Sequence, residues 1–109
     1  MMPTYNKLVR DRIPEIISNT GKSYRTTILS QEEYVQALQA KASEELAEYL
    51  ASPNDEEGVE ELADLLEIIH SLAEAHGATV QQLEEVRQRK AEKRGGFKER
   101  IFLVDVEDE

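Results

Sequence analysis

The sequence predicts an all-α protein, an antiparallel helical bundle that forms a single domain. Glycine and proline are sparse between Ser30 and Arg94, where only Pro53, Gly58 and Gly77 occur. Ala, Leu, Glu, Gln and Lys, which favour helices, dominate this stretch. Its apolar residues recur at the three- and four-residue spacing of amphipathic helices. Because the links between these helices are short, neighbouring helices should pack antiparallel.

Three long helices are expected, each opened by a side chain that can cap a free N–H of the first turn. Ser30 is followed three residues later by Glu33, and Thr79 by Gln82, which are capping-box patterns. The helices should span residues 31–51, run from the Asn54 cap to Gly77, and run from the Thr79 cap to Arg94-Gly95-Gly96.

The two ends of the 1–109 domain have a different character. Pro14 can begin a short helix over residues 15–19. Residues 23–29 alternate in a way that favours a strand, and residues 100–106 are a second candidate strand. These two segments are candidates for a small terminal β-ribbon, which would need helix packing to persist. The acidic tail, residues 105–109, is expected to be disordered.

Composition excludes several classes of function. The chain has 23 acidic and 13 basic side chains, a net charge of −10, which disfavours duplex nucleic acid as a partner. With no cysteine, it has neither disulfides nor thiolate metal sites. The longest aliphatic or aromatic run, residues 101–104, is too short to cross a membrane, and no signal-like segment opens the chain. We therefore expect a cytoplasmic protein. Six aromatic residues provide only a thin core, so a homodimer or homotetramer is expected.

Carboxylates interrupt the apolar face of the first long helix. At 100° per residue from Leu38, the apolar arc runs from about −40° to about +80°. Glu45 falls at about −20°, inside this arc, and Glu48 at about −80°, on its edge. Glu44 falls at about −120°, outside the arc.

The second long helix has the same property. Measured from Leu62, Glu61 falls at about −100°, among apolar residues, and Asp64 adjoins them at about −160°. Buried carboxylates are rare unless they are paired or bind a metal. If the two helices pack through these faces, Glu45, Glu48, Glu61 and Asp64 converge into an all-oxygen site for Mg²⁺, with Mn²⁺ as a substitute.

Two other interpretations of these carboxylates remain open. The first is that the carboxylates form no site. A chain with 23 acidic residues places many carboxylates three residues apart by chance, and most acidic runs are helix faces exposed to solvent. A di-iron bundle would place His three residues after Glu. Here Glu48 follows Glu45 and Asp64 follows Glu61, which disfavours iron.

The pattern Glu44-Glu45-Leu46-Ala47-Glu48, followed by Glu61-Leu62-Ala63-Asp64, resembles the EExxE…ExxD signature of the all-α nucleoside triphosphate pyrophosphohydrolases, the MazG-like superfamily. The segments at residues 5–15 and 93–97 are similar to the ends of a small single-domain subgroup, described as phosphoribosyl-ATP pyrophosphohydrolase-like. The resemblance covers most of the chain.

The resemblance implies a Mg²⁺-dependent hydrolase that cleaves a nucleotide between its α and β phosphates, releasing the monophosphate and pyrophosphate. Glu45, Glu48, Glu61 and Asp64 would hold the metal, which neutralises charge on phosphate oxygens. Glu44 would support the site from outside the metal face. The general base would be one of the metal-bound carboxylates.

Basic residues are the candidates for binding the substrate's phosphates. Lys90, Lys93 and Arg94 continue the face of the third long helix toward a double glycine. Lysine and arginine at this end of a helix are also expected from the helix dipole alone. Lys7 and Arg10 could bind phosphate or only neutralise the acidic bundle.

The motifs do not decide which nucleotide is the substrate. A histidine-pathway enzyme would act on phosphoribosyl-ATP, and a house-cleaning enzyme on canonical or damaged nucleotides. Tyr5, Tyr34 and Tyr49 are candidates for stacking on a base, and tyrosine accepts any base. The alternative of a different class is a non-enzymatic helical interaction module whose acidic face binds a basic partner.

Overall fold

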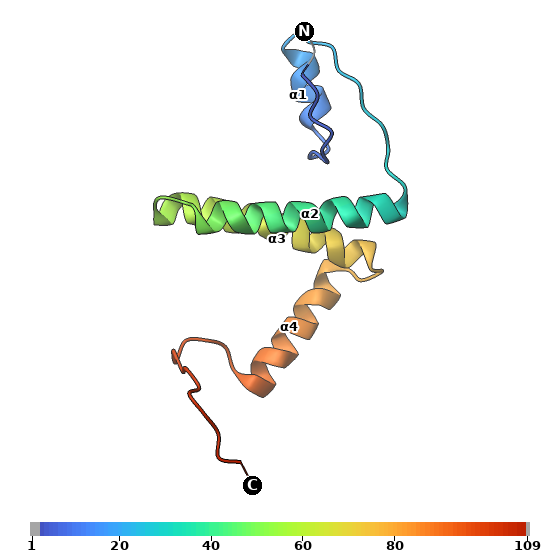
Figure 1. Ribbon diagram of the computed structural model, residues 1–109. Helices are drawn as coiled ribbons and strands as arrows, with labels where there is room; N and C mark the ends of the chain where they lie inside the picture. The colour runs from blue at the N-terminus through green and yellow to red at the C-terminus, as the bar shows by residue number, and fades with distance from the viewer. Residues whose placement is uncertain (1–2, 109) are drawn as a thin grey trace.

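The computed structural model describes residues 3–108 and contains only α-helices in this part of the chain (Figure 1). The predicted all-α class is therefore confirmed. The helices are α1 (Ile13–Asn19), α2 (Gln31–Leu50), α3 (Asp55–Ala75) and α4 (Val80–Arg94).

The predicted caps form and fix where each long helix begins. Ser30 Oγ accepts a hydrogen bond from the Glu33 backbone N–H at 3.2 Å, and the Ser30 N–H donates to the Glu33 carboxylate at 3.1 Å. Thr79 and Gln82 make the same reciprocal pair before α4, at 3.0 and 2.8 Å. Asn54 accepts from the first turn of α3 at 2.9 Å. Local capping chemistry thus sets the start of all three helices.

Helices α2 and α3 pack side by side and antiparallel, as predicted, and form the hairpin that positions the candidate site. Leu38 of α2 and Ile68 of α3 are the buried apolar side chains among the described residues. Gly58, in the first turns of α3, is also buried. The hairpin thus has a narrow contact along its length, and little of its apolar surface is covered by its own chain.

Helix α4 leaves the hairpin instead of lying along it. It contacts α3 but, within residues 3–108, not α2. The chain turns between α3 and α4 at Gly77, whose φ of +86° is readily available only to glycine. Figure 1 shows α4 extending away from the α2–α3 hairpin on the side opposite α1.

The predicted terminal ribbon is wrong, because neither candidate strand forms in the described chain. Residues 23–29 and 100–106 contain no strand. Figure 1 shows these segments on opposite sides of the hairpin, so their backbone groups have no opportunity to pair. The predicted short helix does form, beginning at Ile13 with Pro14 in its first turn. In the acidic tail, residues 105–108 have no regular structure, and Glu109 lies outside the described residues.

The whole molecule is elongated. Its radius of gyration is 18.9 Å and its extents are 66 × 35 × 25 Å. A compact domain of this length would have a radius of gyration of about 13 Å. In the described part of the chain, no helix is both long and apolar enough to cross a membrane.

Candidate metal centre

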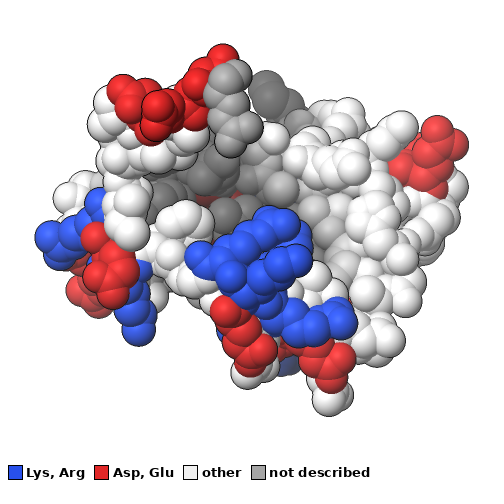
Figure 2. All heavy atoms as spheres, turned by 90° about the horizontal axis from the view of Figure 1, so that it is seen from below, with Lys and Arg blue, Asp and Glu red and all other residues white. Residues whose placement is uncertain are grey.

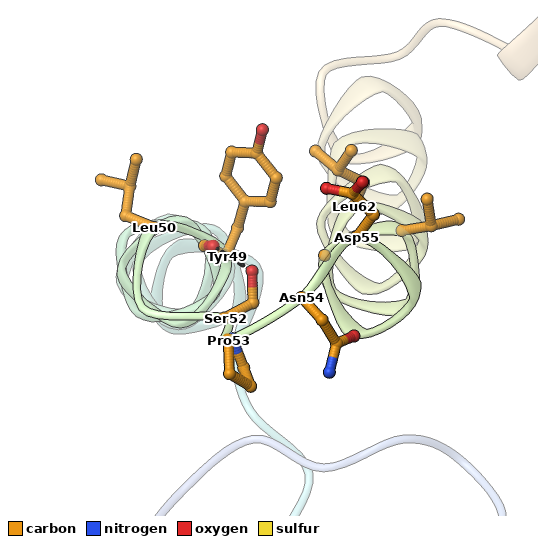
Figure 3. Close-up of a pocket in the computed structure, with 9 residues that line it drawn as sticks. Tyr49, Leu50, Ser52, Pro53, Asn54, Asp55 and Leu62 are labelled. Atoms are coloured by element: carbon orange, nitrogen blue, oxygen red, sulfur yellow. Dashed lines mark hydrogen bonds between the residues drawn. The ribbon is translucent and has the colours of Figure 1, made fainter.

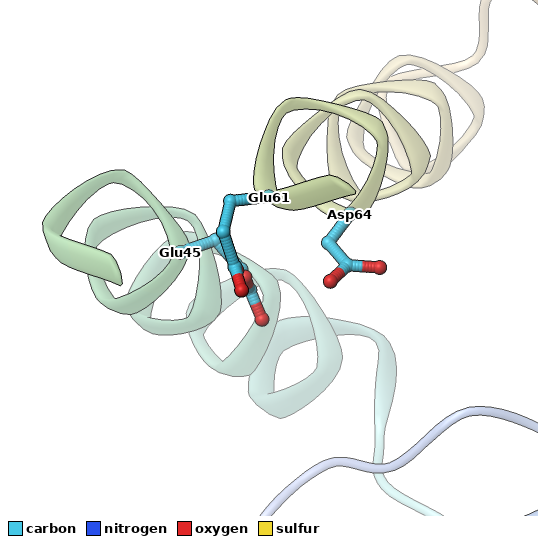
Figure 4. A group of neighbouring side chains, drawn as sticks. All are labelled: Glu45, Glu61 and Asp64. Carbon is cyan, nitrogen blue, oxygen red and sulfur yellow. The ribbon is translucent and has the colours of Figure 1, made fainter. Parts of the chain in front are cut away.

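Three carboxylates from the two helices of the hairpin converge. Glu45 comes from α2, and Glu61 and Asp64 come from α3. One oxygen of each residue lies within 4.8 Å of an oxygen of each of the others. In Figure 4 the carboxylates of Glu45 and Glu61 lie next to each other, with Asp64 beside them. Antiparallel packing places the second half of α2 opposite the first half of α3, which brings these side chains together.

The cluster is partly withdrawn from solvent. Glu45 Oε2 and Glu61 Oε2 are buried, and neither accepts a hydrogen bond from a described donor. A buried polar atom without a partner costs about 1–3 kcal/mol, and more when it is charged. These two oxygens therefore need a proton or a cation.

The pKa values of Glu45 and Glu61 are both raised from their ordinary value. Burial, above all, raises the pKa of Glu45 to about 7, and the neighbouring carboxyls of Glu61, Glu48 and Asp64 add to the shift. For Glu61, a hydrogen bond with Glu45 lowers the pKa, but burial and the charges of Glu48 and Asp64 outweigh it, so its pKa is also raised. Burial and the neighbouring carboxyls thus both favour the neutral form of these groups when no cation is bound.

Arg10 pairs with the cluster from the N-terminal segment. Its Nη2 donates to Asp64 Oδ1 at 2.6 Å. The side chains of Arg10 and Asp64 remain 58% and 43% exposed, so solvent screens the pair and its contribution to stability is small. Within residues 3–108, no other basic side chain forms an ion pair with the cluster.

Three of the four predicted metal ligands, Glu45, Glu61 and Asp64, come together in the structure. Glu48 is exposed and supplies no ligand atom to the cluster, although its charge raises the pKa of Glu45 and Glu61. Glu44 is exposed and also supplies none. Glu48, which the sequence suggested as a fourth metal ligand, therefore lies at the rim of the site.

The predicted phosphate-binding residues are more scattered. Of these, Arg10 alone forms an ion pair with the cluster in the part of the chain described. Lys90, Lys93 and Arg94 lie on the far half of α4, which does not contact α2. Lys7 is exposed in the N-terminal segment. Seen from the α4 side, Lys and Arg side chains gather beside Asp and Glu side chains and do not form one uniformly basic face (Figure 2).

A pocket of about 470 Å³ lies at the tip of the hairpin, on the side of Leu50 and Val59 (Figure 3). Tyr49, one helical turn after Glu45, lines it together with Leu62, the neighbour of Glu61. Ser52 and Asn54 add polar groups from the turn. The aromatic ring and polar rim suit a planar ring with hydrogen-bonding edges, and Tyr49 is one of the predicted stacking residues.

Gly58 is a part of this region that sequence reasoning did not single out. A Cβ at this position would lie 3.3 Å from Ser52 Oγ and 3.8 Å from Tyr49 Cε1. Glycine therefore allows α3 to approach the turn closely at the pocket. A glycine within a sequence that otherwise favours helix is the signal that could have pointed to such a close approach.

Comparison with known proteins identifies no family. No family model matches the chain, and no solved structure matches it. An uncharacterized protein of Mycolicibacterium smegmatis is 44% identical over 54 residues. The match covers 50% of this chain and 55% of that relative, so the chain spans about half the length of the relative it matches.

Proposed function

We propose that the protein is a Mg²⁺-dependent nucleotide pyrophosphohydrolase, with the metal held by Glu45, Glu61 and Asp64. The observation that supports this most directly is the pair of buried, unpartnered oxygens on Glu45 and Glu61. They come from facing helices, and a third carboxylate oxygen lies within 4.8 Å of them. A divalent cation would satisfy both oxygens and would offset the repulsion within the cluster.

The donor set favours a hard cation. All the ligand atoms are carboxylate oxygens, which suit Mg²⁺ and, as a substitute, Mn²⁺. When bound, such a metal neutralises charge on phosphate oxygens and lowers the pKa of water. The rim carboxylate, Glu48, adds a negative charge that strengthens the attraction for the cation.

The same residues carry the resemblance to the MazG-like superfamily. Its two acidic motifs fall on α2 and α3, on the helices whose packing forms the cluster. This agreement supports phosphoric anhydride hydrolysis over simple metal binding. In the proposed complex, Arg10 binds a phosphate of the nucleotide.

A pyrophosphate-release screen tests the proposal. Nucleoside triphosphates and phosphoribosyl-ATP are each offered with Mg²⁺ and with EDTA, and release of pyrophosphate only with Mg²⁺ is expected. Glu61→Gln should abolish release. Glu60→Gln, the exposed neighbour one residue away, is the matched control and should retain it.

Calorimetry separates metal binding from turnover. Mn²⁺ should bind the wild type and the Glu60→Gln variant, and binding should be lost in Glu61→Gln. Metal binding without turnover of any nucleotide would contradict the hydrolase and favour an acidic binding module. Absence of metal binding would contradict the metal centre itself.

A further inference from the structure

The N-terminal arm, residues 3–29, lies outside the α2–α3 hairpin. Its helix α1 makes no contact with α2, α3 or α4 in the described chain. Residues 22–29, which lead from α1 to the Ser30 cap of α2, have no regular structure. Figure 1 shows α1 standing apart from the hairpin and connected to it by this extended segment. Helix packing therefore does not fix the position of the arm.

A single ion pair joins the arm to the hairpin within residues 3–108. It is the contact of Arg10 Nη2 with Asp64 Oδ1 at 2.6 Å. The other ion pair of the arm, between Arg12 and Glu15, is internal. Arg10 and Asp64 are both partly exposed, and an exposed ion pair contributes little and is easily broken. The arm is thus held at the carboxylate cluster by a contact that a competing cation can displace.

The arm and the hairpin carry opposite charges. Residues 31–75 hold one basic side chain, Lys41, and 13 acidic ones. The arm holds two acidic side chains, Asp11 and Glu15, and five basic ones. The basic residues of the arm are Lys7, Arg10, Arg12, Lys22 and Arg25. Coulomb attraction therefore draws the arm toward the hairpin, and it is strongest where the carboxylates of the candidate metal centre crowd together.

Arg10 and a divalent cation need the same carboxylate. Asp64 accepts the hydrogen bond from Arg10 and also belongs to the candidate metal centre. Arg10 satisfies Asp64 but leaves the buried oxygens of Glu45 and Glu61 without a partner. A divalent cation has twice the charge of a guanidinium and can take oxygen ligands from all three residues. The cluster therefore favours the divalent cation, which in turn repels the guanidinium.

We propose that Arg10 fastens the N-terminal arm over the carboxylate cluster in the metal-free protein and dissociates from Asp64 when a divalent cation binds there. This inference rests on the metal centre of the proposed function. In the metal-free chain, Arg10 offsets part of the repulsion among the carboxylates. Once Arg10 dissociates, the arm loses its one ion pair with the hairpin in the described residues and moves about the segment 22–29. Arg10 is then free to bind a phosphate.

Fluorescence anisotropy of a dye on the arm tests this control. Since the chain has no native cysteine, Ser18→Cys, at an exposed position of α1, takes a single dye. A fastened arm tumbles with the whole molecule, whereas a released arm also moves on its own, on the nanosecond timescale of terminal segments, which lowers the anisotropy. We expect the anisotropy of this labelled chain to fall when Mg²⁺ is added without nucleotide.

Three further changes in the labelled chain separate holding from release. Arg10→Gln should give the low anisotropy before any Mg²⁺ is added. Arg12→Gln is the matched control and should respond to Mg²⁺ as the labelled chain does, because Arg12 pairs within the arm. Glu61→Gln removes a metal ligand but keeps Arg10 and Asp64, so its anisotropy should stay high with and without Mg²⁺. High anisotropy in metal-free Arg10→Gln would overturn the proposal.

Calorimetry with Mg²⁺ on the same labelled chain distinguishes failure of this inference from failure of the proposed function. If Mg²⁺ binds and the anisotropy stays high, the cation does not release the arm, and this inference alone is wrong. If Mg²⁺ does not bind, the metal centre is wrong, and the release of the arm is wrong with it.

Discussion

At the scale of single residues, the positions of Glu45 and Glu61 around their helices agree with how far these side chains are buried. Glu45 and Glu61 fall inside the apolar arcs of their helices, and both are partly buried and face each other. Glu48 falls on the edge of its arc and is exposed. Angular position along one helix therefore indicated that Glu45 and Glu61 would be partly covered. It did not separate Glu48, which was expected as a metal ligand but is exposed, from Asp64, which joins the cluster. It could not predict the contact between Arg10 and Asp64, because that contact depends on the path of a segment without regular structure.

The raised pKa of Glu45 makes a prediction about stability and pH. Its ordinary value is 4.5 and its folded value is about 7. Between these values the folded chain holds a proton that the unfolded chain has released. The free energy of unfolding should therefore fall as pH rises from about 4.5 to about 7, by at most about 1.4 kcal/mol per pH unit from this group.

Urea unfolding of the metal-free protein across that range measures the effect. The Glu45→Gln variant should lose this part of the slope, and Glu60→Gln should keep it. Saturating Mn²⁺ should replace the proton and make stability rise with pH instead. Identical slopes in the wild type and Glu45→Gln would show that Glu45 titrates normally.

Arg10 should compete with a cation for Asp64. Removing it by Arg10→Gln frees the carboxylate and should strengthen Mn²⁺ binding several-fold, while nucleotide turnover falls because a phosphate loses its partner. Arg12→Gln is the matched control, since Arg12 pairs with Glu15 at 3.2 Å and not with the cluster. Only in Arg10→Gln should the affinity for Mn²⁺, measured by calorimetry, rise while nucleotide turnover, measured by steady-state kinetics, falls. Weaker metal binding in this variant would mean that Arg10 supports the cluster and does not compete for it.

At the scale of elements, the helix ends could be predicted and the arrangement of the helices only in part. Caps such as Ser30 and Thr79 act within one turn, so the sequence around them is sufficient. The alternation in residues 23–29 favours a strand, but a strand needs a partner, and none approaches it in the described chain. The direction of α4 depends on the turn at Gly77 and on contacts with α3, which local patterns do not encode.

The close approach at Gly58 should be sensitive to side-chain size. In Gly58→Val, the new Cβ would lie 3.3 Å from Ser52 Oγ, and the added methyl groups need further space. We expect the free energy of unfolding to fall by about 1–3 kcal/mol. Gly96→Val, where nothing lies within 4 Å, should have little effect. Equal midpoints of chemical unfolding for the two variants would show that the turn at the pocket adapts freely.

The basic end of α4 tests whether a second element contributes to catalysis. If Lys90 and Arg94 bind substrate phosphates, Lys90→Ala or Arg94→Ala should raise KM or lower kcat at least tenfold, about 1.4 kcal/mol. If they only complement the helix dipole, each change should cost a few tenths of a kcal/mol of stability and leave the kinetics unchanged. Since α4 does not contact α2 within residues 3–108, a kinetic effect would favour a phosphate contact made between copies of the chain.

At the scale of the whole molecule, the carboxylate cluster belongs to a hairpin that has a very small core and exposes apolar side chains such as Leu50, Leu62 and Leu66. Leu38 and Ile68 are the only buried apolar side chains in the described residues. A contact this narrow cannot offset the conformational entropy lost on ordering two long helices. The carboxylates depend on that hairpin for their spacing, so the expected homodimer should help to form the site by covering exposed apolar side chains such as Leu62 and Leu66.

Folding and association should consequently be coupled. If the native state is a dimer and the unfolded state is a single chain, each tenfold dilution lowers the free energy of unfolding per dimer by about 1.4 kcal/mol. The melting temperature should fall on dilution from 100 to about 1 μM, the factor of a hundred corresponding to about 2.7 kcal/mol. Leu66→Ala should lower the melting temperature and enlarge the dissociated fraction, because Leu66 is one of the exposed apolar side chains that a second copy could cover. Glu67→Ala should do neither, because it removes no apolar side chain. Circular dichroism over that concentration range makes the measurement, and a melting temperature independent of concentration would show that the hairpin folds without a second copy.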